Sequence, residues 1–343
     1  MAIRVAINGF GRVGRLVMRA MAQQPEKHHV AAVNDLMPAA DLAYLLKHDS
    51  IYGRFPYEVQ VDGTSLWVHK REILTFSERD PAALPWHDLD IDVVIEASGL
   101  FRDPRGQTRS GYDSHLDAGA KKVVITAPTT DGTKLIVLGV NDGALTDDDR
   151  CVSNASSTTS SIAHVARVLH EALRIERGFV VSVHAYTGDQ RLVDAAQGGD
   201  LRRGRAAGVN IIPIVGNPAK PIGRVIPELD GRLDGYALRV PVPAGSLADL
   251  TVDVHNETTV DEVNAIIREA AEGPMRGYLA YSDEPLVSTD VIGDAHSSIF
   301  DSLNTRVIGG TMVKCTMWYD NEWGYSCRTA ELAERIAVPA LRA

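Results

Sequence analysis

The glycine-rich segment at residues 9–14 constrains the fold of this chain more than any other feature. It follows an apolar run at residues 3–7 and precedes a stretch with one apolar face at residues 15–23. This order is typical of the first βαβ unit of a dinucleotide-binding sheet. Glycine lets the backbone turn tightly and approach a pyrophosphate at a helix N-terminus. The segment therefore predicts a strand, a turn and a helix.

An acidic residue supports this interpretation. Asp35 stands 21 residues after Gly14, at the end of a second predicted strand at residues 30–33. A carboxylate there can accept hydrogen bonds from ribose hydroxyls. It would repel a 2′-phosphate, so the sequence favours NAD over NADP, with Arg12 and Arg79 as the nearby cations that weaken this preference. The predicted cofactor residues of this half are Gly9, Gly11, Arg12, Val13, Gly14, Asp35 and Arg79.

Further apolar runs extend the same pattern through the N-terminal half. Residues 93–95, 123–125 and 135–138 read as strands separated by helices or loops. We therefore expect an α/β domain with a Rossmann-type, doubly wound, mostly parallel sheet over residues 1–156.

The second half has a different pattern. A helix is predicted at residues 161–172 and a strand at 179–183, and residues 235–241 and 249–255 alternate as antiparallel strands with one solvated face do. We expect an α+β catalytic domain at residues 157–321 with a mixed or antiparallel sheet. A C-terminal helix within residues 322–343, strongest at 326–336, is expected to pack back on the first domain.

Composition limits the possible environments and partners. The three cysteines, Cys151, Cys315 and Cys327, argue against a disulfide framework and have no metal-site spacing. A formal net charge of −10 disfavours nucleic acid as the main partner. No stretch approaches the roughly 18 apolar residues of a membrane span, and the first 15 residues are too polar for a signal peptide. We expect a cytoplasmic protein.

Several separated motifs point to one family. They are residues 8–12, 153–159, 184–187, 239–241 and 318–326, with 225–229 and 296–298 in support. In this order and spacing they resemble the phosphorylating glyceraldehyde-3-phosphate dehydrogenases, and the resemblance covers nearly the whole chain. It implies NAD-dependent oxidation of glyceraldehyde 3-phosphate, or a close phosphorylated aldehyde, to an acyl phosphate through a covalent acyl-enzyme. It also implies a homotetramer, with the aldehyde and inorganic phosphate as small-molecule partners.

The resemblance assigns a role to each motif residue. Ser157 occupies the place of the family's nucleophilic cysteine, and His184 is the general base and acid. Asn321 would orient the nicotinamide amide, and Thr126 would lie near the cofactor. The substrate's own phosphate maps to Thr187 and Arg239, with Arg205 contributing. The attacking phosphate maps to Ser156, Thr158, Gly216 and Asn217.

Three departures from the family pattern affect the expected activity. A cysteine thiol, with a pKa near 8.5, can ionise beside an imidazolium, whereas the Ser157 hydroxyl must lose its proton to His184 during attack. Gly216-Asn217 replaces the family's Thr-Gly, which removes a donor worth roughly 1–3 kcal/mol to a charged acceptor. The loop between Asp194 and Leu201 lacks the family's Pro-His-Lys run. We expect the normal reaction to be slower by several orders of magnitude.

Four explanations stay open at this point. Ser157 is a substitution made to trap a complex of an otherwise active enzyme, or the chain is a natural paralogue with a different aldehyde or acyl acceptor. A catalytically inactive protein that binds NAD or sugar phosphate is the third. A Ser157-His184 hydrolase is the least supported, because no carboxylate is evident to orient the histidine.

Overall fold

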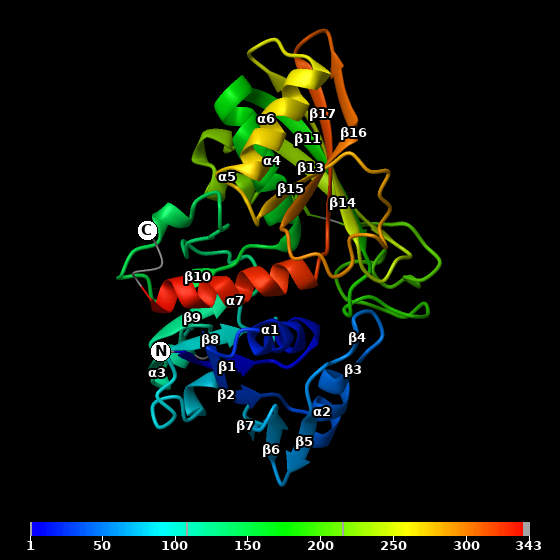
Figure 1. Cartoon of the computed structure of the whole chain (residues 1–343). Helices are drawn as coiled ribbons and strands as arrows, with labels where there is room; N and C mark the ends of the chain where they lie inside the picture. The colour runs from blue at the N-terminus through cyan, green and yellow to red at the C-terminus, as the bar shows by residue number, and fades with distance from the viewer. Residues whose placement is uncertain (1, 108, 215, 339–343) are drawn as a thin grey trace. The chain divides into compact units, whose positions relative to one another are not determined.

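The chain folds into two units, each built around its own sheet (Figure 1). The computed structural model describes residues 2–107, 109–214 and 216–338. The first unit comprises the chain up to Ile136, Asp142–Ser156 and the chain from Ser326 onward; the second comprises Val137–Asn141 and Ser157–Tyr325. The chain therefore crosses between the units more than once, and one of the crossings lies between Ser156 and Ser157.

The first unit contains an eight-stranded sheet. Its strands run parallel from β10 to β7, and β7, β6 and β5 form an antiparallel extension. This confirms the predicted Rossmann-type sheet. Across the sheet the order is β10 (Cys151–Ser153), β9 (Lys122–Ile125), β8 (Val93–Glu96), β1 (Ile3–Asn8), β2 (His28–Asn34), β7 (Arg71–Phe76), β6 (Ser65–Val68) and β5 (Val59–Asp62).

Helices and short elements complete this unit. The side chains of Val5 and Ile7 in the central strand β1 are fully buried, which explains why this run reads as apolar on both faces. The remaining elements are α1 (Arg12–Ala22), α2 (Ala39–Lys47), β3 (His48–Asp49), β4 (Gly53–Arg54), α3 (Ser114–Asp117) and the 3₁₀ turns Pro81–Ala83 and Asp142–Ala144.

One predicted strand is wrong. Residues 135–138 are buried, yet only Leu135 forms a bridge, to Ser153, and the chain then turns. The Asn141 side chain accepts a hydrogen bond from the Val137 N–H at 2.7 Å, and the Val137 carbonyl accepts from Val140 N–H at 3.0 Å. These local bonds use the groups that a strand ladder would need.

The second unit contains a mixed seven-stranded sheet, as predicted. β14 alternates strictly between buried and partly exposed residues, β11 pairs with it antiparallel, and β11 pairs with β13 in parallel. The order is β12 (Ile212–Ile214), β13 (Leu233–Val240), β11 (Ile175–Ala185), β14 (Ser246–Val254), β17 (Met312–Tyr319), β16 (Ser298–Ile308) and β15 (Leu279–Ser282). Its helices are α4 (Ser157–Leu173), α5 (Ile222–Val225) and α6 (Val260–Glu272), with the 3₁₀ turn Pro227–Leu229.

The C-terminal helix α7 (Trp323–Ala337) begins in the second unit and continues in the first. The Asp320 carboxylate accepts hydrogen bonds from the backbone N–H groups of Glu322 and Trp323 at 2.9 Å, which caps the helix. Within the first unit, Glu334 lies 2.9 Å from the His28 ring on β2. Residues 339–343 of the predicted helix lie outside the described residues. Among the described helices, none is long and apolar enough to cross a membrane.

Candidate functional site

The three glycines of the turn in the first unit lie in different surroundings. Gly9 has φ +89°, and a Cβ there would lie 2.4 Å from the Cα of Ser98. A Cβ at Gly14 would lie 2.1 Å from the carbonyl oxygen of Gly9. Gly11 differs, because nothing lies within 4 Å of its Cβ position at the N-terminus of α1. Open space at a helix N-terminus fits a bound pyrophosphate, as NAD requires.

Asp35 holds this turn against the end of β2. Its carboxylate accepts from the Phe10 N–H at 2.7 Å and from the Met37 N–H at 3.1 Å. A carboxylate has about four acceptor sites, so capacity for ribose hydroxyls is left. The Arg12 guanidinium pairs with Asp49 at 3.1 Å, so its charge is already opposed by a carboxylate.

The other predicted cofactor residues lie near the same sheet edge or on the surface. Val13 is half-buried in the first turn of α1, and Arg79 is exposed. The Thr126 hydroxyl donates to the Glu96 carbonyl oxygen at 3.0 Å, just beyond β9. Asn321 belongs to the second unit and is described with it below.

The turn that precedes Ser157 is tightly constrained. Ala155 is fully buried and has φ +51°, a left-handed conformation that costs a non-glycine residue about 1 kcal/mol or more. Its N–H donates to the Ser153 hydroxyl at 3.0 Å, and that hydroxyl donates to the Ala127 carbonyl oxygen at 2.6 Å. Ser157 then begins α4, where the positive end of the helix dipole favours a developing negative charge.

His184 lies near the C-terminal end of β11 and is buried. Burial, and next the charge of the Arg239 guanidinium, lower the pKa of its imidazole to about 3. The imidazole is therefore neutral near pH 7. In the described structure, His184 and Ser157 form no direct hydrogen bond.

Two groups compete for the Nδ1 atom of His184. The Ala185 carbonyl oxygen lies 2.7 Å away and can only accept a hydrogen bond, which requires a proton on Nδ1, whereas the Arg239 guanidinium lies close to Nδ1 and can only donate, which requires Nδ1 without a proton. Arg239 also donates to the Ala185 carbonyl oxygen at 3.0 Å. Only the first arrangement leaves the Nε2 lone pair free to act as a base.

Tyr319 is a site residue that the sequence reasoning did not assign. Its hydroxyl lies 2.9 Å from the Thr158 hydroxyl and 3.1 Å from the Ser182 hydroxyl, and its ring meets the His184 ring edge to face at 6.1 Å. Burial raises the pKa of this phenol. The available signals were its place in the 318–326 motif and the single polar Ser182 in an apolar strand.

Ser246 orients Asn321. The Ser246 hydroxyl donates to the Asn321 Oδ1 atom at 2.9 Å and accepts from the Ala185 N–H at 3.0 Å. The amide Nδ2 of Asn321 is thereby the end left to donate to a ligand. Through Ser246, Asn321 is therefore linked to the backbone N–H of Ala185, the residue that follows His184.

The predicted substrate-phosphate residues are only partly together. The Thr187 hydroxyl donates to Asp189, and Arg203 pairs with the same carboxylate at 2.6 Å. Arg205 pairs instead with Asp194 at 2.9 Å. Arg203, which the sequence motifs do not select, is therefore the cation that shares the Asp189 carboxylate with Thr187.

The predicted attacking-phosphate loop is braced locally. Gly216 has φ +141°, so the family's threonine would be strained in this backbone. The Asn217 amide donates to Asp234 at 2.7 Å and accepts from the Ala219 N–H at 2.8 Å. Both ends of this amide are engaged, and a carboxylate lies beside it. Ser156 is half-buried, and Thr158 contacts Tyr319 as described.

Two of the three cysteines are unsuited to replace the nucleophilic cysteine that is missing at position 157. Burial raises the pKa of the Cys151 and Cys315 thiols to about 12, so both stay protonated near neutral pH. Cys327 lies in α7, within the first unit. Among the described residues, no cluster of histidine, cysteine, aspartate and glutamate is arranged to hold a metal ion.

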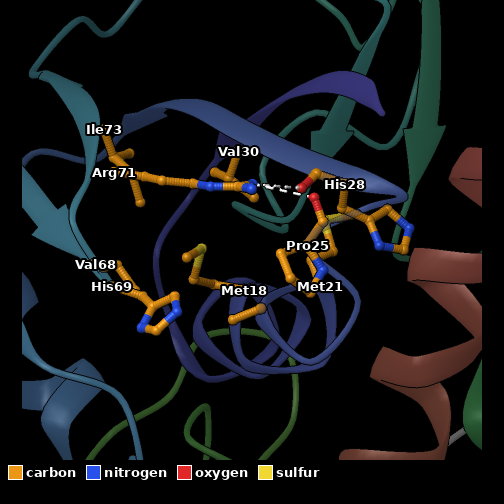
Figure 2. Close-up of a pocket in the computed structure, with 10 residues that line it drawn as sticks. Met18, Met21, Pro25, His28, Val30, Val68, His69, Arg71 and Ile73 are labelled. Carbon is orange, nitrogen blue, oxygen red and sulfur yellow. Dashed lines mark hydrogen bonds between the residues drawn. The ribbon is translucent and has the colours of Figure 1, made fainter. Parts of the chain in front are cut away.

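A small apolar pocket behind the first sheet is not part of the site. It lies between α1 and strands β2, β6 and β7, and none of the predicted site residues lines it. Figure 2 shows Arg71 reaching across it to donate to the carbonyl oxygens of Pro25 and His28, at 3.1 and 3.4 Å. Most of its lining side chains are apolar, and the Arg71 guanidinium is bonded to backbone carbonyl oxygens, which suits packing.

Comparison with known proteins decides the family. Residues 3–104 match the glyceraldehyde 3-phosphate dehydrogenase NAD binding domain, and residues 156–321 match the C-terminal domain of the same dehydrogenase. The chain is 51% identical over 338 residues to glyceraldehyde-3-phosphate dehydrogenase 2 of Streptomyces arenae, covering 98% of this chain and 99% of that protein. The chain belongs to the glyceraldehyde-3-phosphate dehydrogenase family.

Other members of the family are similar to this chain over nearly its whole length. The glyceraldehyde-3-phosphate dehydrogenase of Mycobacterium leprae is 48% identical, with 97% of this chain and 98% of that protein covered. That of Mycobacterium tuberculosis is 49% identical, with 98% and 99% covered. The resemblance found in the motifs is confirmed, and with it the class of NAD-dependent phosphorylating dehydrogenase. The individual roles of the site residues stay predictions.

Proposed function

We propose that this chain oxidises glyceraldehyde 3-phosphate, or a close phosphorylated aldehyde, to an acyl phosphate through an acyl-enzyme on Ser157, and does so slowly. The observation that carries the proposal is the pairing of His184 with Arg239. A neutral imidazole lies beside the cation that the family pattern assigns to the substrate's phosphate, and its Nε2 becomes a base once that phosphate draws the guanidinium away from Nδ1.

The protein groups perform the proton transfers. His184 Nε2 takes the Ser157 proton as the hydroxyl oxygen attacks the aldehyde carbon, which gives a hemiacetal. When bound, NAD would supply the hydride acceptor, and loss of hydride would leave the adduct as an ester of Ser157. Phosphate oxygen then attacks the ester carbonyl and the Ser157 oxygen leaves, recovering a proton from His184. Aldehyde, phosphate and NAD are consumed, and an acyl phosphate, reduced NAD and one proton are produced.

The substrate's phosphate also activates the base. A phosphate at Arg239 and Thr187 would engage the guanidinium that now donates to His184 Nδ1. Nδ1 would then carry the proton and donate to the Ala185 carbonyl oxygen, leaving Nε2 free to accept. An anion at this position would also oppose the charge that helps to lower the pKa of His184. We therefore expect phosphorylated aldehydes to react faster than neutral ones.

The oxygen nucleophile explains the slow rate. A thiol at the N-terminus of α4 can ionise near neutral pH, whereas a hydroxyl must be deprotonated during attack. The resulting oxygen ester is also a poorer acyl donor than a thioester. Nothing else in the described site has to change for this loss.

The decisive experiment is NAD reduction by Ser157→Cys, with glyceraldehyde 3-phosphate in the presence and absence of phosphate. We expect a phosphate-dependent rate at least about 10³-fold above that of the unsubstituted chain, which corresponds to about 4 kcal/mol of activation free energy. Ser156→Cys is the matched control, since it places a thiol one residue earlier, outside α4, and should not restore turnover. Failure of Ser157→Cys, with NAD binding retained, would contradict the proposal and indicate a binding protein.

A natural paralogue with another acyl acceptor is the second candidate. The contacts of Asn217 with Asp234 and Ala219 favour it, because they engage the amide and hold a carboxylate beside a loop expected to bind an anion. In Ser157→Cys, this candidate predicts a rate that does not rise with phosphate and does rise with a neutral or cationic nucleophile such as an amine. Saturable acceleration by phosphate would exclude it.

We also propose that the chain acts in the cytoplasm as a homotetramer. The expected reducing compartment agrees with three free cysteines. Exposed apolar side chains on the second sheet, including Phe179 and Tyr236, are suited to cover by another copy.

A further inference from the structure

A buried carboxylate that has no role in the chemistry lies at the C-terminal end of β8. Glu96 is 2% exposed, and every group that faces its oxygens can donate. Oε2 accepts from the Asn8 amide at 2.6 Å and from the His115 ring at 3.0 Å. Oε1 accepts from the Ser98 N–H at 2.9 Å and from the Ser98 hydroxyl. All four acceptor positions of the carboxylate are therefore used.

The proton on His115 is fixed by a neighbouring indole. Trp86 Nε1–H can only donate, and it lies 3.0 Å from His115 Nδ1. Nδ1 must accept, so the proton of the neutral ring is on Nε2 and is donated to Glu96. Both rings are fully buried. His115 thus acts as an oriented neutral donor to the carboxylate.

These contacts connect three parallel strands at the edge where the glycine turn lies. Asn8 is the last residue of β1, and its Oδ1 accepts from Asn34, the last residue of β2, at 2.7 Å. Figure 1 shows β8, β1 and β2 side by side in this sheet. Asn34 in turn exchanges hydrogen bonds with the backbone of Glu78 at 2.8 and 2.9 Å.

Both sides of Gly9 are held by this one carboxylate. Asn8 precedes Gly9 in the chain, and the Ser98 backbone is the surface that Gly9 packs against, where a Cβ would come within 2.4 Å. Glu96 binds Asn8 with one oxygen and Ser98 with the other. A shift of either contact would therefore move the glycine turn relative to α1.

We propose that Glu96 is a positioning residue for the pyrophosphate of NAD, acting through Asn8 and Ser98 on the glycine turn. It does not touch the cofactor; it sets the place of the backbone that does. The inference depends on NAD binding and does not depend on turnover at Ser157.

Glu96→Gln tests the proposal with little change of volume. The amide replaces one acceptor oxygen by an NH₂ group, which in either orientation faces a donor of Asn8, His115 or Ser98. At least one donor is left without its acceptor, and the turn must adjust. We expect the dissociation constant for NAD to rise about tenfold, the effect of roughly one lost hydrogen bond.

The measurement is calorimetric titration of NAD, ADP-ribose and adenosine into the full chain. Positioning of the pyrophosphate predicts weaker binding of NAD and ADP-ribose, and binding of adenosine within twofold of the unsubstituted chain. Glu334→Gln is the matched control, because Glu334 is a largely buried carboxyl beside a buried histidine of the same unit but lies in α7. It should leave all three affinities unchanged.

Two results would overturn the proposal: unchanged affinity for NAD in Glu96→Gln, or equal weakening of all three ligands. If Glu96→Gln fails to fold, Ser98→Ala carries the test. It removes the hydroxyl bond to Glu96, together with the exposed Leu100 N–H bond to the same hydroxyl, and keeps the Ser98 N–H bond to Glu96, so the same ligand pattern is expected with a smaller change. NAD binding by the chain together with failure of Ser157→Cys turnover would contradict the proposed function and leave this inference standing.

Discussion

His184 shows how the environment of one residue decides its chemistry. Burial and the Arg239 charge hold its imidazole neutral, and the Ala185 carbonyl and the Arg239 guanidinium compete to decide which nitrogen carries the proton. The same lowered pKa makes His184 a site of acid sensitivity, because the buried ring resists a proton that the unfolded chain accepts.

Stability should therefore fall as the pH is lowered through the range between the two pKa values of His184. The pKa is about 6.5 when unfolded and about 3 when folded, so between them the unfolded state binds more protons and is favoured as pH falls. We expect His184 to contribute a loss of about 2 kcal/mol between pH 7 and pH 5.

Urea unfolding of the unsubstituted chain and His184→Gln at pH 7 and pH 5 measures this difference. The pH dependence should be shallower in His184→Gln. His255→Gln is the control, because His255 is an exposed histidine of the same unit and should leave the slope unchanged. Equal slopes in His184→Gln and the unsubstituted chain would refute the assignment of a depressed pKa.

The glycines of helix α1 and of the turn before it are of two kinds. At Gly9 and Gly14 a side chain would strike backbone atoms, whereas at Gly11 the backbone has φ −68° and the Cβ position is open. The first kind of glycine serves the fold, and the second leaves open space at the N-terminus of α1. A sequence pattern alone presents all three as one motif.

Gly11→Ala should consequently weaken NAD binding without loss of stability. The methyl group would occupy the space that the pyrophosphate approaches, so the dissociation constant should rise at least about tenfold. Gly9→Ala should instead lower stability by about 3 kcal/mol or more, because of strain at φ +89° and the clash with Ser98. Thermal unfolding and NAD titration of both variants check this. A destabilised Gly11→Ala would show that the space is needed by the protein itself.

Helix α4 should lower the pKa of a thiol placed at its first position. In Ser157→Cys, the helix dipole favours thiolate, so the alkylation rate by iodoacetamide should have its pH midpoint below 8.5. Cys151 and Cys315, with pKa values near 12, should stay unmodified on the same timescale. Mass spectrometry of the modified peptides identifies the reacting thiol. A midpoint at or above 8.5 would contradict activation by the helix.

At the scale of the whole molecule, elements set by consecutive residues are predictable from the sequence, whereas contacts between side chains far apart in the sequence are not. Strand β1, the glycine turn and the alternation of β14 are predictable because the residues that set each of them follow one another in the sequence. The strand predicted at 135–138 is wrong because the Asn141 side chain bonds the Val137 N–H, a contact that the apolar composition of the run does not reveal. Tyr319 and Glu96 are not predictable because their partners lie on other elements, and Arg203 because its partner Asp189 lies 14 residues away in an irregular connection, at a separation that no spacing rule covers.

The second sheet also bears on assembly. Helices α4 and α6 pack against one face, while Phe179 on β11 and Tyr236 on β13 are 67% and 50% exposed. Aromatic side chains at such exposure are typical of surfaces that another protein copy covers. A homotetramer should bury them, and charge introduced there should weaken assembly because two carboxylates per copy would be desolvated.

Sedimentation velocity should accordingly find a four-chain species for the unsubstituted protein and smaller species for Phe179→Glu/Tyr236→Glu. Val61→Glu is the control, since Val61 is an exposed apolar residue of β5 in the first unit, and it should sediment like the parent. A monomeric parent would refute the tetramer. If the double variant is still a tetramer, the sheet face contributes too little to hold the copies together. The contact between copies would then lie on another surface, such as the loop that carries the exposed Leu192 and Leu201.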